Sequence, residues 1–211
     1  MSKTGLSSQD SDKLRDVGRI FGTSLKVYKD LQILYSKIDD RIQNEYCYCA
    51  RAQETIIGSI IDSRFDDNFY DALENYSSAA KHALNDSLDL VFAYAKIKAD
   101  ELSEICEYTT IGDVYTDYNN VTAIFEKYAE TISLSREERG MERIEAYIKM
   151  AEDEEYKTLN KFCLNIKTIK KDLRIKRRKE LNTARKDLGM LVVGILAIVA
   201  TIIIGLVTAL G

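Results

Sequence analysis

Cysteine and histidine are the residue types that most often carry nucleophilic and metal chemistry, and this chain of 211 residues has few of them. It contains four cysteines, Cys47, Cys49, Cys106 and Cys163, and one histidine, His82. A zinc site needs about four such ligands at a recognisable spacing. In a helix, residues two apart, such as Cys47 and Cys49, do not share a face. We therefore predict no metal site and no Cys–His catalytic pair.

The motifs of other enzyme classes are also missing from the sequence. It contains no glycine-rich phosphate loop and no nucleophile elbow, and its 34 acidic residues are best explained as solvated helix faces. A formal net charge of −4 argues against nucleic-acid binding. The sequence predicts a non-enzymatic protein with no catalytic residue, no cofactor, no small-molecule substrate and no nucleic-acid partner.

A basic segment at residues 167–187 is the strongest candidate for a binding surface. It holds ten basic and three acidic residues, a net charge of +7, so the remainder of the chain carries −11. Such a segment is either a solvated helix face beside a membrane or a surface that attracts anionic phospholipid. The candidate lipid-binding residues are Lys170, Lys171, Arg174, Lys176, Arg177, Arg178, Lys179, Arg185 and Lys186.

The segment that follows, residues 188–211, has no charge and no proline. About 20 apolar residues in a helix cross the roughly 30 Å hydrocarbon core of a bilayer, so the length predicts a C-terminal transmembrane helix. Lys and Arg accumulate on the cytoplasmic side of a span. We therefore expect a single-pass, tail-anchored protein of an endomembrane (endosome, ER or Golgi), with residues 1–187 in the cytosol. Small residues recur every fourth position and could let two such helices pack closely: Ala197, Thr201, Gly205 and Ala209.

The elements that must position these segments are helices. Apolar residues recur every three or four positions over residues 12–61, 68–134 and 141–187, which predicts three long amphipathic helices joined by short turns. Residues 7–10 are expected to cap the first helix, Asp66, Asp67 or Asn68 the second, and a capping box at 135–138 the third. A kink is expected near Gly112.

Short turns make neighbouring helices antiparallel. The predicted fold is therefore all-α, with three long antiparallel helices followed by the transmembrane helix. The predicted domains are a disordered leader at 1–11, a cytosolic helical domain at 12–187 and the tail at 188–211.

The three-helix pattern resembles the BAR domain found at the C-terminus of sorting nexins. Residues 19–43, RIFGTSLKVYKDLQILYSKIDDRIQ, are similar to its first helix, with repeated Tyr and Leu layers. Residues 72–128, including the stretch from Leu102 to Tyr108, resemble its second helix, and residues 155–188 its basic last helix. The resemblance implies an antiparallel crescent-shaped homodimer, or a heterodimer with another BAR-like chain, on phosphoinositide-rich endosomal membrane.

Two features depart from that family: the phosphoinositide-binding PX domain is missing, and an apolar tail is added. With the resemblance, the sequence predicts a membrane-associated scaffold that binds or shapes endomembranes in vesicle trafficking. Two alternatives stay open. One is a tail-anchored fusion or tethering protein of the SNARE kind, although Gly140 and the acidic run at 152–155 interrupt the required heptads. The other is a pore-forming helical protein, although only one hydrophobic helix is present.

Overall fold

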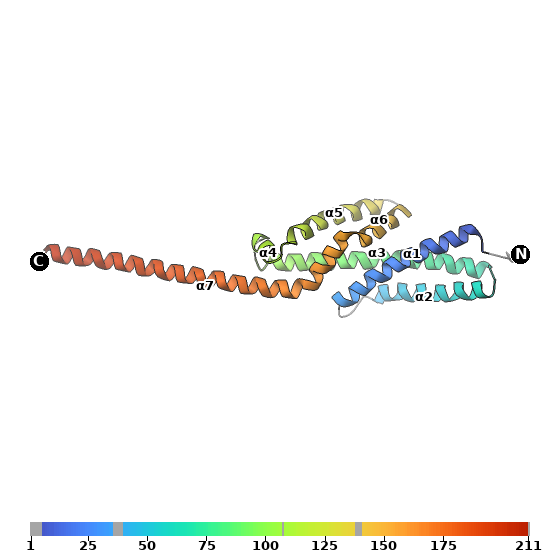
Figure 1. The fold of residues 1–211 in the computed structure, drawn as a ribbon, viewed down its shortest axis with the longest axis horizontal. Helices are drawn as coiled ribbons and strands as arrows, with labels where there is room; N and C mark the ends of the chain where they lie inside the picture. The colour runs from blue at the N-terminus through green and yellow to red at the C-terminus, as the bar shows by residue number, and fades with distance from the viewer. Residues whose placement is uncertain (1–5, 36–39, 107, 138–140, 211) are drawn as a thin grey trace.

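Helices make up the regular secondary structure of the chain. The computed structural model describes residues 6–35, 40–106, 108–137 and 141–210, and within these ranges it contains helices and no strand. The all-α prediction is confirmed. The helices, shown in Figure 1, are α1 (Ser8–Leu34), α2 (Asp40–Ile61), α3 (Asp67–Ser103), α4 (Tyr108–Val114), α5 (Tyr118–Glu137), α6 (Met141–Glu152) and α7 (Glu154–Leu210).

The first predicted long helix is wrong, because the chain reverses within it. α1 ends at Tyr35, which has an extended backbone (φ −110°, ψ 134°), and α2 runs back beside α1 (Figure 1). The Tyr46 hydroxyl on α2 donates a hydrogen bond to the Ser24 carbonyl at 2.7 Å, and the Tyr28 and Tyr46 rings lie 4.3 Å apart. In a single straight helix, residues 40–61 would extend away from residues 8–34. The hairpin instead places the apolar faces of both α1 and α2 against α3.

The second predicted helix is also divided. α3 ends at Ser103, and α4 forms a short turn of helix that contains Gly112 in its interior. α5 then runs back along α3 (Figure 1), with Phe92 of α3 against Phe125 and Tyr128 of α5 at centroid distances of 5.6 and 5.9 Å. The expected kink at Gly112 is therefore replaced by chain breaks on either side of α4.

The third predicted helix breaks at Asp153 into α6 and α7. The predicted capping box also fails, since Ser135 lies inside α5 and Glu138 lies outside the described residues. Two other caps are confirmed: the Ser7 side chain accepts from the Asp10 N–H at 3.1 Å, and the Asp66 side chain accepts from the Phe69 N–H at 3.3 Å. α1 thus begins inside the segment that was predicted to be a leader.

α3 is the central helix of the bundle. It packs against α1 and α2 toward one end and against α4, α6 and α7 toward the other. The core is rich in apolar and aromatic side chains, with Phe69, Leu84 and Leu102 of α3 and Tyr147 of α6 and Phe162 of α7 fully buried. This arrangement leaves the C-terminal half of α7 projecting beyond the bundle (Figure 1).

The predicted transmembrane helix is not supported by the structure. Over the described residues, no helix is both long enough and apolar enough to cross a bilayer. The apolar segment continues the charged helix α7 without a break. The expectation of a tail-anchored, single-pass endomembrane protein with a cytosolic 1–187 segment is therefore wrong.

Candidate functional site on helix α7

The projecting part of α7 is the most exposed element of the structure. Among the side chains that the structure describes, Leu173 is the last buried one, and every residue from 177 to 198 is exposed. We call residues 174–198 the arm. It is one uninterrupted stretch of α7, about 37 Å long at 1.5 Å per residue.

Three of the nine predicted lipid-binding residues instead fasten the root of the arm to the bundle. Lys170 pairs with Glu101 of α3, Lys176 pairs with Asp113 of α4 at 2.5 Å, and Arg177 donates to the Ile105 carbonyl at 2.9 Å. These contacts join α7 to the end of α3 and to α4. Their charges are thus already engaged within the protein.

The other six predicted residues are exposed, and none has an ion pair with another residue that the structure describes. They are Lys171, Arg174, Arg178, Lys179, Arg185 and Lys186. At about 100° per residue, all six fall within an arc of roughly 140° on the helix. The helical arrangement therefore gathers them on one side of α7.

Lys167 belongs to the same surface, although the sequence prediction left it out. It is exposed and lies four residues before Lys171, one turn earlier on the same side. Basic residues at 167, 171, 174, 178 and 185 recur at steps of three, four or seven, and this helical spacing in the sequence could have identified Lys167. We call Lys167 and the six residues above the basic stripe. It extends about 29 Å along the helix.

The basic stripe lies on the solvent side of α7. Ile166, Ile169 and Leu173, which pack into the bundle, are roughly opposite to it on the helix, and so are Glu180 and Asp187. The positive potential is therefore directed away from the bundle, although one exposed acidic residue, Asp172, borders the stripe about 20° beyond Lys179. Such an arrangement attracts an extended anionic surface.

The apolar end of the arm directly follows the basic stripe. Its large apolar side chains between 188 and 198 are 47–67 % exposed and point in all directions around the helix. A helix that is apolar all round is normally surrounded by a protein core or by lipid. Of the four residues predicted to pair two membrane helices, Ala197 is exposed, while the side chains of Thr201, Gly205 and Ala209 lie outside the described residues.

Cys47 and Cys49 lie on α2, His82 on α3, Cys106 just after α3 and Cys163 on α7. Within the described residues, no group of three or more His, Cys, Asp or Glu side chains could hold a metal ion. Cys47 is exposed and Cys49 buried, on different sides of α2. Burial raises the thiol pKa of Cys49, and also that of Cys163, to about 12. Both thiols are therefore protonated at neutral pH and are poor nucleophiles.

A groove of about 760 Å³ between α2 and α3 is a second candidate site. Its lining mixes basic side chains, including Arg51 and Arg64, with acidic ones, including Glu45 and Asp71. Since neither sign dominates and the groove is open, its chemistry favours no particular ligand. The arm is the better candidate site.

The ion pairs at the root of the arm predict a pH dependence of stability. Glu101 lies between Lys170 and Lys98, the latter at 2.5 Å, and its pKa is lowered from 4.5, chiefly by the hydrogen bond from Lys170. A lowered carboxyl pKa contributes stability above the unfolded-state value, and this is lost as pH falls through the folded-state value. Glu101→Gln should therefore cost about 0.5–1 kcal/mol at pH 7 and nothing below the lowered pKa.

Urea unfolding followed by circular dichroism, in steps from pH 7 down to pH 2, would measure how this difference shrinks as the carboxyl is protonated. Glu104→Gln is the matched control, because Glu104 is exposed and makes no ion pair among the described residues. A loss at pH 7 that is equal in both variants, or a loss that stays constant over the whole pH series, would contradict the assignment.

Comparison with protein-family models, curated proteins and solved structures finds no match to this chain. The fold and the arm define the protein as an all-helical bundle with one projecting basic and apolar helix. The resemblance to BAR domains stays a prediction, and the helix lengths on which it rested differ in the structure.

Proposed function

We propose that this protein is a non-enzymatic, membrane-associated scaffold whose arm binds anionic phospholipid. The observation that carries the proposal is the continuity of two surfaces on one helix: the solvent-facing basic stripe leads directly into exposed apolar side chains. Near an anionic membrane each basic residue contributes about 1 kcal/mol of attraction. The apolar residues that follow would contact acyl chains at the surface.

Lipid fits the arm better than a protein partner does. A helical partner covers one stripe of a helix, whereas the apolar side chains of 188–198 are exposed on every side. Self-association of arms side by side is opposed by the net charge of +7 on residues 167–187. An anionic lipid surface satisfies both the charge and the all-round apolar exposure.

Vesicle flotation with the full chain tests the proposal. We expect weak binding to neutral phosphatidylcholine vesicles and binding that rises steeply when phosphatidylserine is added. Raising the salt from 50 to 500 mM should reduce the charge-dependent part, because salt screens exposed charges. Equal binding to neutral and anionic vesicles at both salt concentrations would contradict a role for the basic stripe.

A further inference from the structure

The break between α6 and α7 lies within the acidic run at 152–155, where Asp153 directly precedes the first residue of α7. Residues 141–187 contain neither proline nor glycine, but the apolar spacing is interrupted at 152–155 and Asp153 is a favourable N-cap residue for α7. A sharp break without proline or glycine is expected where a side chain inserts into the helical hydrogen-bond ladder. A contact from a neighbouring element can therefore act together with this local N-cap preference to hold the break.

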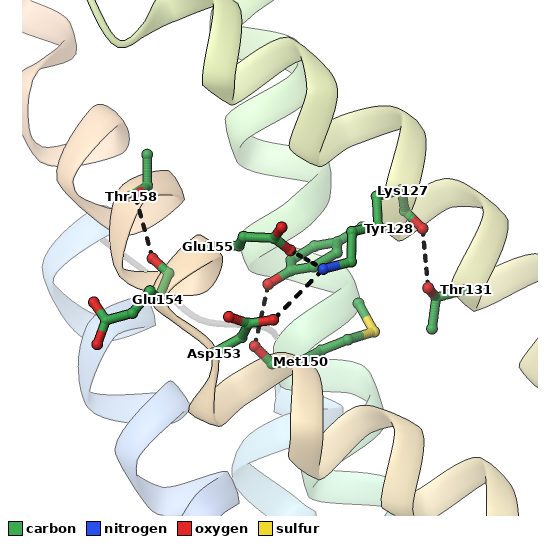
Figure 2. Close-up of polar contacts among 8 residues, drawn as sticks. All are labelled: Lys127, Tyr128, Thr131, Met150, Asp153, Glu154, Glu155 and Thr158. Carbon is green, nitrogen blue, oxygen red and sulfur yellow. Dashed lines mark hydrogen bonds and ion pairs between the residues drawn. The ribbon is translucent and has the colours of Figure 1, made fainter.

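α5 supplies the inserted side chain. Figure 2 shows Tyr128 of α5 directed at the break, where its hydroxyl donates to the Met150 carbonyl at 3.2 Å. In a continuous helix this carbonyl would accept the N–H of Glu154, four residues on. Tyr128 is buried, so its hydroxyl is held in this position by the packing around it.

Lys127 holds the other side of the break. Its ammonium group pairs with Glu155 in the first turn of α7 and lies 3.5 Å from Asp153 at the break itself (Figure 2). The hydrogen bond to Glu155 raises the pKa of Lys127, so this side chain stays charged. Two consecutive residues of α5 thus contact both the last turn of α6 and the first turn of α7.

We propose that the α6–α7 junction is a hinge that Tyr128 and Lys127 hold bent, and that their release joins α6 and α7 into one helix. The direction of α7, and with it that of the basic stripe, would change on release. The consequence for lipid binding rests on the function proposed above, but the hinge itself does not. α5 would then control how the arm meets a membrane.

The hinge is tested in the full chain without lipid. Nitroxide labels are placed at Glu142→Cys in α6 and Thr168→Cys in α7, in a chain carrying Cys47→Ser and Cys106→Ser. Buried Cys49 and Cys163 remain unlabelled because burial keeps these thiols protonated and covered. In a continuous helix the two labelled positions are about 39 Å apart.

We expect the double variant Tyr128→Phe and Lys127→Met to lengthen the label distance toward that value. Hydrogen exchange at the Glu154 amide should slow at least tenfold, since this N–H gains the Met150 carbonyl. The matched control, Tyr147→Phe with Lys161→Met, removes a buried tyrosine hydroxyl and a lysine charge away from the break. It should leave both readouts as in the unmodified chain.

A second variant, Asp153→Asn with Glu155→Gln, removes the partners of Lys127 while leaving α5 intact, and it decides the question if the first variant does not fold. It should shift both readouts in the same direction by a smaller amount. A label distance and a Glu154 exchange rate that stay at control values in the folded variants would overturn the hinge. If both readouts shift but the unmodified chain does not bind phosphatidylserine vesicles, only the proposed function is overturned.

Discussion

Reversing three charges on the basic stripe, with Arg174→Glu, Arg178→Glu and Arg185→Glu, is expected to weaken binding to phosphatidylserine vesicles at least a hundredfold. Each basic residue near an anionic surface is worth about 1 kcal/mol, so loss of three removes about 3 kcal/mol, roughly a hundredfold in affinity. Reversal adds repulsion. The three side chains are exposed and unpaired among the described residues, so the fold should not change. Vesicle titration followed by flotation measures the affinity.

The matched control carries the same change in net charge on the bundle, with Lys26→Glu, Lys29→Glu and Lys96→Glu. These lysines are exposed on α1 and α3, away from the arm. We expect a loss of binding of only a few fold, from the altered charge of the whole molecule. Equal losses in the two variants would show that overall charge matters and the basic stripe does not.

The largest expected loss of stability comes from Phe162→Ala. Phe162 is fully buried near the root of α7, with its ring 5.9 Å from that of Tyr115 and 6.2 Å from that of Tyr118. Truncating a buried phenylalanine removes apolar burial and leaves a cavity, at a cost of about 3–5 kcal/mol. Urea unfolding monitored by circular dichroism should show this loss. Phe162→Leu retains much of the volume and should cost less.

Leu164→Ala is the control for this prediction. Leu164 is two residues away on the same helix but is 51 % exposed, so its truncation should change the free energy of unfolding by no more than about 0.5 kcal/mol. A similar loss in both variants would mean that α7 is not packed onto α4 and α5 at Phe162. The fastening of the arm to the bundle would then need another explanation.

Features that depend on residues close in sequence could be predicted. The helical class and the caps at Ser7 and Asp66 follow from apolar spacing and from a side-chain acceptor three residues before an N–H group. The basic segment could also be identified, including six residues that the structure leaves exposed. The spacing that adds Lys167 was present in the sequence as well.

The division of the predicted long helices could not be read from the same signals. Apolar residues spaced three and four apart continue on both sides of the reversal at Tyr35. This spacing shows which side of a helix is buried, but it does not show where one helix ends and the next begins. The reversal depends on contacts between distant residues, such as Tyr46 with Ser24. The transmembrane prediction rested on composition and length, and the structure describes no helix that meets both requirements.

The sequence by itself determined that this protein is helical, where α1 and α3 begin, and that one segment combines basic and apolar residues, since these are local properties of the chain. Only the tertiary structure decided which charges are available. Lys170 pairs with α3, Lys176 pairs with α4, and Arg177 donates to the turn after α3, whereas their neighbours on the opposite side of α7 face solvent. It also decided the break at Asp153, because the Tyr128 hydroxyl that occupies the Met150 carbonyl comes from another helix.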